Sequence, residues 1–364
     1  MSEDKKRKRK TDKAERRIGR FWSASIILTA VAIIFCLVKI SLWNSRSADE
    51  QLAAINATRA IPESENAGVA YSKLAEDNLP LPADPPVVDK QALILTVKKP
   101  WLSENYPKLA AWLDERQDLI SKLLDISRME KCRLAIPSDR QQMSYFTNPV
   151  RQMRGWASLL VRSANMDAGE GRIDAAIEKY ACVLQMGSHL RQQPVLSYYN
   201  NGVAHELLAL QSLEKLITQT ELTEKQLAAV EAALLPARNN WKQQSKIMTK
   251  VQRLFEKKLL DRRTRPRITD WRRYWEYWKE TSKSDDHLLN RTHEFHLYTL
   301  TNRRRMHILI ALRRFKNKTG HWPQSLDRIK PPLSKETLTD PRDNTPFVYE
   351  LTGEDFKLHS KGAN

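Results

Sequence analysis

One apolar segment, residues 21–43, differs from the rest of the chain. Its centre, residues 26–38, contains no charged residue. Trp22 and Trp43 lie near its two ends, where membrane proteins carry interfacial aromatic residues, and Lys39 can extend its amino group toward the interface. Because about 20 residues of helix cross a bilayer core, the pattern predicts one transmembrane helix.

After this span, prolines divide the chain into short segments. Residues 44–60 have a helical pattern that ends at Pro62, and residues 65–77 have a second amphipathic pattern. Residues 79–88 are rich in proline, which lacks a backbone N–H, and they favour an extended segment. We expect the next helix to begin at Pro100.

From there to about residue 235, apolar residues recur at steps of three and four, which predicts a body of several helices. Thr223 precedes one such run and fits a helix N-cap. Residues 160–187 have the pattern of a helix–turn–helix unit similar to a tetratricopeptide repeat. The side chains expected between its helices are Ala164, Ala176, Tyr180 and Val183. An ordinary antiparallel helix pair is the alternative.

The pattern changes after about residue 300. A helical segment runs to Lys318, and Gly320 follows it. Residues 347–351 and 356–360 then alternate apolar and polar side chains on either side of a turn that contains Gly353. This arrangement predicts a β-hairpin.

These elements predict a mainly α fold with a multi-helix, TPR-like body and a small C-terminal α+β module with a long helix and a β-hairpin. Only 10 glycines occur in 364 residues, which argues against folds that need many tight turns. The expected parts are a basic cytoplasmic tail (1–20), the transmembrane helix (21–43), membrane-proximal helices with a Pro-rich segment (44–100), a helical domain (101–300) and the C-terminal module (301–364).

The net charge of +18 comes from two regions. Residues 1–20 contain ten Lys or Arg and four Asp or Glu, which gives +6. Residues 238–316 contain 22 Lys or Arg and eight Asp or Glu, which gives +14, so the rest of the chain is close to neutral at −2. Basic clusters of this kind favour contact with anionic surfaces or polymers.

Basic residues are far more frequent before the predicted span than after it. The positive-inside rule therefore places the N-terminus in the cytoplasm and the body in the periplasm. We expect a single-pass protein of the cell inner membrane with an uncleaved anchor, and a cleaved signal peptide is the alternative. The residues that set this topology are Lys5, Lys6, Arg7, Lys8, Arg9, Lys10, Trp22 and Trp43.

The most unusual local sequence is an aromatic stripe. Trp271, Trp275 and Trp278 share one face of a predicted helix because they are spaced i, i+4 and i+7. An exposed stripe would stack on sugars or single-stranded nucleic acid, or lie at a membrane interface. A helix that packs the same face into the core is the alternative. The candidate binding face consists of Trp271, Tyr274, Trp275, Trp278, Arg272 and Arg273.

A second basic group consists of arginines on either side of this stripe. These arginines could contact anionic lipid, wall polymer or nucleic acid, or form solvated helix faces. The predicted topology argues against nucleic acid, so the expected partners are membrane lipid and other envelope proteins or an anionic polymer. The group consists of Arg262, Arg263, Arg265 and Arg267 before the stripe, and Arg303, Arg304, Arg305, Arg313 and Arg314 after it.

The sequence assigns no catalytic, cofactor or metal site. His293 and His296 are three residues apart and could share a metal ion, but a zinc motif of the HExxH type needs a spacing of four. Surface or packing roles are the alternative. Cys132 and Cys182 either pair in an oxidising compartment or remain buried thiols.

The C-terminal region combines four short motifs. They are a helix end (Ala311, Leu312, Phe315, Gly320, Trp322 and Pro323), a following turn (Leu326 and Ile329), an Asp-Pro element (Asp340, Pro341, Asp343, Pro346, Phe347 and Tyr349) and a chain end (Ser360, Gly362, Ala363 and Asn364). This set resembles the C-terminal part of the major pseudopilins of type II secretion.

The N-terminal region departs from that family. A prepilin has a cleavage site directly before its apolar helix and a Glu early in the helix, whereas here Gly19 precedes Arg20 and Ala24 replaces the Glu. The resemblance therefore does not imply a pilus subunit. The whole layout resembles a family of uncharacterised bacterial envelope proteins, which implies location and architecture but no activity.

These observations lead us to expect a membrane-anchored envelope protein that is a non-enzymatic scaffold or binding protein with an extracytoplasmic helical domain. One alternative is an envelope hydrolase or binder that acts on polysaccharide, with the tryptophans as sugar platforms beside carboxylates about 5–10 Å apart. Another alternative is a component of a secretion or pseudopilus-like apparatus.

Overall fold

The computed structural model describes residues 47–77, 90–136, 149–234, 241–264, 286–329 and 333–361. The chain divides into two compact units, Met1–Ile55 and Asn56–Asn364. The described residues contain eleven α-helices and one two-stranded antiparallel sheet. The expected mainly α fold with a C-terminal β-hairpin is therefore confirmed.

The elements follow one another along the chain in three groups. The first contains α2 (Ala48–Ala57), η1 (Glu63–Glu65), α3 (Ala67–Asp77), α4 (Lys90–Lys98), η2 (Ser103–Asn105), α5 (Pro107–Asp114) and α6 (Gln117–Ser127). The second contains α7 (Pro149–Gly169), α8 (Ile173–Arg191), α9 (Leu196–Gln219), α10 (Glu224–Ala233) and α11 (Trp241–Thr264). The third contains α13 (Asp286–Thr319), η3 (Leu326–Ile329), β1 (Val348–Thr352) and β2 (Asp355–His359).

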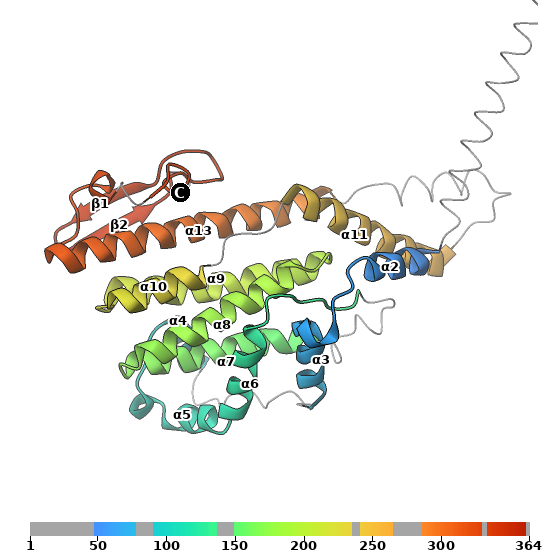
Figure 1. The fold of residues 1–364 in the computed structure, drawn as a ribbon, viewed down its shortest axis with the longest axis horizontal. Helices are drawn as coiled ribbons and strands as arrows, with labels where there is room; N and C mark the ends of the chain where they lie inside the picture. The colour runs from blue at the N-terminus through green and yellow to red at the C-terminus, as the bar shows by residue number, and fades with distance from the viewer. Residues whose placement is uncertain are drawn as a thin grey trace, which may run out of the picture. The chain divides into compact units, whose positions relative to one another are not determined.

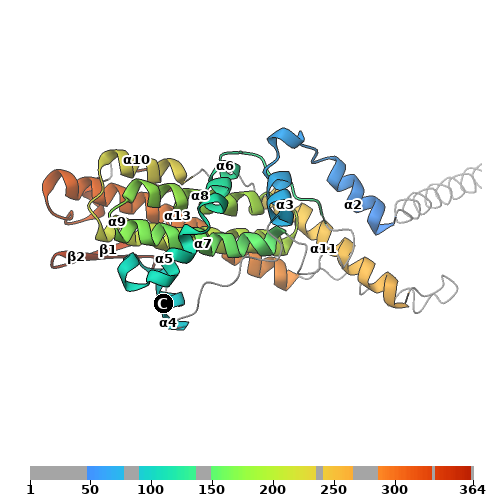
Figure 2. The same cartoon turned by 90° about the horizontal axis from the view of Figure 1, so that it is seen from below.

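Three long helices form the centre of the larger unit. Helices α7, α8 and α9 run alongside one another, and α13 packs on α9 (Figure 1). Helix α4 packs on α7, while α6 and α10 pack on α8 (Figure 2). The apolar faces that the sequence predicted are therefore buried between helices.

The helix pair expected within residues 160–187 consists of α7 and α8. Its packing positions are fully buried, namely Ala164, Ala176, Tyr180 and Val183. The Tyr180 hydroxyl donates a hydrogen bond of 2.5 Å to the Asn165 side-chain oxygen on the opposite helix. Small side chains let the two helices approach, and this bond satisfies the one polar group of the buried ring.

Helices α8 and α9 approach even more closely, where two glycines face each other. A Cβ atom on Gly202 would lie 2.6 Å from the carbonyl oxygen of Gly187, and a Cβ on Gly187 would lie 2.7 Å from the carbonyl oxygen of Gly202. Both distances are shorter than van der Waals contact. This crossing therefore requires glycine on both helices.

The expectation that a helix starts at Pro100 is wrong, because the helix there begins at Pro107. Trp101 stays outside it and docks on α7 instead. Its backbone N–H donates to the Asn165 carbonyl (3.2 Å), and its indole N–H donates to the Arg162 carbonyl (3.1 Å). A Cβ on Gly169 would lie 2.2 Å from the Trp101 carbonyl oxygen, so the close approach of this segment depends on glycine.

Thr223 caps α10 as expected. Its hydroxyl accepts a hydrogen bond from the backbone N–H of Gln226 (3.3 Å), and its own N–H donates to the Gln226 side chain (3.0 Å). This reciprocal capping box satisfies two backbone donors that the first turn of a helix leaves without partners.

The C-terminal hairpin pairs Val348 with His359 and Thr352 with Asp355. Trp322 lies between the hairpin and α13, with its ring 4.6 Å from that of Phe356 and the guanidinium of Arg313 4.7 Å from its centre. Helix α13 is continuous from Asp286 to Thr319. It therefore runs without interruption through position 301, at which the C-terminal module was expected to begin.

We expect Gly202→Ala to lower the free energy of unfolding by about 1–3 kcal/mol, because the added methyl group overpacks the α8–α9 crossing. Urea unfolding of the detergent-solubilised full chain, followed by near-UV circular dichroism, measures this change.

Gly155→Ala is the matched control. A Cβ on Gly155 meets no atom within 4 Å, so the same substitution should leave stability unchanged or raise it by up to about 1 kcal/mol through helix propensity. Equal effects of the two substitutions would show that the crossing tolerates a side chain.

Candidate functional site

The aromatic binding face predicted from the sequence lies outside the described residues. This holds for Trp271, Tyr274, Trp275, Trp278, Arg272 and Arg273. The topology residues between Lys5 and Trp43 also lie outside them. Among the helices that the structure does describe, none is long and apolar enough to span a bilayer.

The arginines of the second basic group that lie on α13 are described, and they contact other elements of the molecule, whereas Arg265 and Arg267 lie outside the described residues. Arg305 binds both oxygens of Glu214 on α9 (2.9 and 2.7 Å), and Arg313 donates to the carbonyl oxygens of Ile217 and Thr218 at the end of that helix (both 2.7 Å). These arginines attach α13 to α9.

Arg304 and Arg314 are also engaged within the molecule. Arg304 pairs with Glu336 (2.6 Å), and Arg314 pairs with Glu224 (2.7 Å) and Glu231 (2.9 Å) on α10. These arginines are therefore paired within the molecule, and contact with an anionic partner stays a prediction. The arginines connect neighbouring elements because their partners come from segments distant in the sequence.

Among the described residues, the most deeply buried ion pair is centred on Glu206 of α9, which has no exposed surface. Arg191 of α8 donates to one carboxylate oxygen at 2.6 Å, and Arg303 of α13 pairs with the other. Burial alone would raise the pKa of Glu206, but the two guanidinium charges outweigh it and lower the pKa. Three helices therefore meet at one ionised carboxylate.

A ring cluster extends this centre. The Tyr199 hydroxyl is hydrogen-bonded to Nδ1 of His296 (2.8 Å), and the Trp241 ring stacks on both His293 and His296 with centroid distances of 4.9 Å. The two histidines thus pack against a tryptophan. In the part of the chain that is described, no group of three or more His, Cys, Asp or Glu could hold a metal ion.

Three buried histidines are held neutral. Burial lowers the pKa of His189, His205 and His296 to about 4, and the nearby Arg191 charge adds to the effect at His296. His189 is satisfied, since Tyr71 donates to its Nδ1 (3.1 Å) and its Nε2 lies 2.7 Å from the Met129 carbonyl oxygen. Within the described residues, neither ring nitrogen of His205 has a hydrogen-bond partner.

The two described cysteines are buried, free thiols, so the alternative without a disulfide holds. Burial raises the pKa of both Cys132 and Cys182 to about 12. Protonated, enclosed thiols are poor nucleophiles, which makes these side chains structural.

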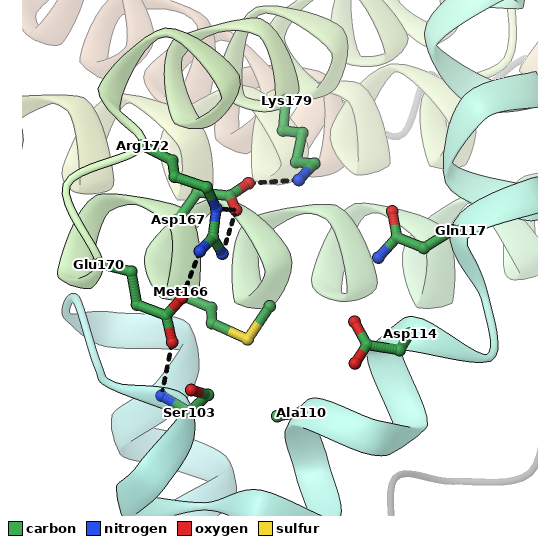
Figure 3. A pocket seen from close by; sticks show the side chains of 9 residues that line it. All are labelled: Ser103, Ala110, Asp114, Gln117, Met166, Asp167, Glu170, Arg172 and Lys179. Carbon is green, nitrogen blue, oxygen red and sulfur yellow. Dashed lines mark hydrogen bonds and ion pairs between the residues drawn. The ribbon is translucent and has the colours of Figure 1, made fainter.

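A pocket of about 400 Å³ opens beside the turn between α7 and α8 (Figure 3). Its walls come from four parts of the chain: the η2 turn, the facing ends of α5 and α6, the end of α7 with its following turn, and α8. The lining residues are Ser103, Ala110, Asp114, Gln117, Met166, Asp167, Glu170, Arg172 and Lys179.

One side of the pocket is an ion-pair network. Asp167 is nearly buried and accepts hydrogen bonds from Lys179 of α8 and from Arg172 Nε (2.8 Å). Glu170 accepts the backbone N–H of Ser103 (3.0 Å) and pairs with Arg172. The hydrogen bonds from Ser103 and Arg172 lower the pKa of Glu170 to about 2. This network fixes the turn and joins it to the η2 turn.

The opposite side of the pocket is less constrained. Gln117 donates only to the Leu113 carbonyl (3.2 Å), and the Asp114 carboxylate forms no hydrogen bond or ion pair with any described residue. Figure 3 shows these two side chains and the Lys179 amino group directed toward the same space, which Met166 borders. A donor and an acceptor are therefore presented to a guest molecule.

Sequence reasoning missed the buried charges, although a signal was present. Glu206 lies at helical spacing among the buried Tyr199, Val203, Leu210 and Leu213, and it is therefore a charge on an apolar face. A charged residue in that register must find a partner of opposite sign inside the protein. The periodicity does not say which residue that partner is.

No protein-family model matches the sequence, and no curated protein or solved structure is detectably similar to it.

We expect Glu206→Gln to lower the free energy of unfolding by about 3–5 kcal/mol, since it leaves two buried guanidinium groups without their shared counter-ion. Urea unfolding measures the change. Glu224→Gln removes an exposed carboxylate that pairs with Arg314 and should cost no more than about 1 kcal/mol. Similar losses in the two variants would contradict the central role of Glu206.

Stability should also fall as the pH falls from 7 to 5. An unfolded histidine has a pKa of about 6.5, so the unfolded state binds protons in this range, whereas the buried rings stay neutral. Each buried histidine therefore lowers the free energy of unfolding by about 1–2 kcal/mol over this range. His205→Leu should reduce the loss by that amount, whereas His287→Gln, at an exposed position, should not. An unchanged pH dependence in His205→Leu would be evidence against a neutral His205.

Proposed function

We propose that the chain is a membrane-anchored envelope protein whose extracytoplasmic helical body is a non-enzymatic scaffold or binding protein. The pocket of Figure 3 supports the binding role, and the apolar segment at residues 21–43 supports the anchor. The pocket is open and polar, and ion pairs hold the side chains of one of its sides in place. Preorganised polar groups at the border of a concave space are typical of ligand sites.

The pocket favours binding over acid–base or nucleophilic catalysis. Its lining residues include no histidine and no cysteine. Asp167 and Glu170 are both paired with Arg172. The hydrogen bonds from Ser103 and Arg172 lower the pKa of Glu170, which makes that carboxylate a weak base. This supports a role for the carboxylates in shaping the site.

The use of charge in the body supports a scaffold. Arginines that would otherwise form a basic surface pair with Glu206, Glu214 and Glu336. Helix α13 is thereby attached to the α8–α9 layer on one side and to the C-terminal residues on the other. A body with such connections presents its surfaces in fixed relative positions.

The resemblance to pseudopilins supports the second candidate, a component of a secretion apparatus. Among the motif residues that the structure describes, Asp340 accepts hydrogen bonds from Thr301 (2.6 Å) and from the Arg342 backbone (3.0 Å), and Tyr349 donates to the Pro323 carbonyl (2.7 Å). Co-purification with pilin-like proteins would favour this candidate.

The anchor and its orientation are tested by expressing the full chain in bacteria with a tag at each end. We expect both tags on one polypeptide in the membrane pellet after alkaline carbonate extraction, because a spanning apolar helix resists release. Protease added to spheroplasts should digest the body and spare the N-terminal tag. A variant that begins at residue 47 serves as the control and should leave the pellet.

Two results would overturn the proposal. Protection of the body in intact spheroplasts would place it in the cytoplasm. Loss of the N-terminal tag from a released body would show a cleaved signal peptide in place of an anchor.

A further inference from the structure

We propose that the pocket beside the α7–α8 turn binds an ammonium group together with the neighbouring carbonyl or carboxylate oxygen, as found in a free α-amino acid or at the amino terminus of a peptide. This inference rests on the proposed binding function and adds the chemical class of the ligand.

The lining of the pocket carries an excess of negative charge. Its lining contains two cations, Arg172 and Lys179, and three carboxylates, Asp114, Asp167 and Glu170, which gives a net charge of −1. Arg172 is engaged by both Asp167 and Glu170, and Lys179 by Asp167. The excess negative charge therefore resides on Asp114, and a cationic guest neutralises it.

The Lys179 amino group provides a hydrogen-bond donor in the same pocket as Asp114. An ammonium group has three N–H donors, and Lys179 uses one of them for Asp167. The amino group and the Asp114 carboxylate point into the same space (Figure 3). A guest that fits both must carry a cation and a hydrogen-bond acceptor close together, as the first atoms of an amino acid or a peptide do.

The size and polarity of the pocket suit a small ligand with a short side chain. A volume of about 400 Å³ lies at the low end of the range for small-ligand pockets, about 300–1,000 Å³. Met166 and Ala110 supply apolar surface for a short side chain, and Gln117 supplies an amide beside it. No aromatic ring is among the lining residues, so the platform on which a sugar would stack is missing from this pocket.

Isothermal titration of the detergent-solubilised full chain tests the inference with three probes: L-alanine, trialanine with a free amino terminus, and N-acetyl-trialanine. We expect trialanine to bind at least about tenfold more tightly than its acetylated form, because acetylation removes the charge that Asp114 attracts. Equal binding of alanine and trialanine would identify a free amino acid as sufficient, whereas binding of trialanine alone would identify a peptide terminus.

The matched variants are Asp114→Asn and Asp118→Asn. Both residues are exposed and differ by four positions, but Asp118 pairs with Lys122 and does not line the pocket. Asp114→Asn should weaken trialanine binding about tenfold, and Asp118→Asn should leave it unchanged. Near-UV circular dichroism of both variants confirms that they are folded.

Three outcomes would overturn the inference: no heat with either free amine, equal affinity for the free and acetylated peptides, or full binding by Asp114→Asn. None of these bears on the orientation of the body, which the protease experiment measures separately. A periplasmic body without amine binding would remove only the ligand class, whereas a cytoplasmic body would remove the proposed envelope function even if the amines bind.

Discussion

The architecture depends on one buried carboxylate. Glu206 of α9 is paired with Arg191 of α8 and Arg303 of α13, so that a single ionised group joins three helices. An ionised carboxylate is costly to bury without partners, and two buried guanidinium groups repel each other without the carboxylate. The three side chains therefore stabilise the fold only together. Arg303 thereby attaches the long α13 to the body. Other arginines of α13 extend this contact along α9 and α10.

The pocket depends on a similar arrangement at the other end of α8. The paired Asp167, Lys179 and Arg172 fix the turn between α7 and α8. The close approach of Trp101 to Gly169 brings the η2 turn, and the α5 and α6 that follow it, against this turn. Packing and ion pairs thus fix the walls of the pocket, and the Asp114 carboxylate and the Lys179 amino group border the same space (Figure 3). Such preorganisation lowers the entropic cost of binding.

The sequence predicted much of the fold, because its signals are local. Apolar spacing located the α7–α8 pair, Thr223 marked the start of α10, and alternation located the C-terminal hairpin. It failed at Pro100, where hydrogen bonds from Trp101 to α7 overrode a local helix signal. It also failed for the basic residues of α13, since a partner such as Glu206 lies 97 residues away from Arg303. The pocket was not predicted for the same reason, as its walls meet only through tertiary packing.

A double-mutant cycle on Glu206 and Arg303 tests this view of the structure most directly. Glu206→Gln, Arg303→Gln and the double variant are unfolded by urea alongside the unmodified chain. We expect a coupling free energy of about 2 kcal/mol or more, as found for close, desolvated charge pairs. A coupling within about 0.5 kcal/mol of zero would mean that the two residues act independently, and it would contradict the claim that one shared ion pair joins α13 to the helical body.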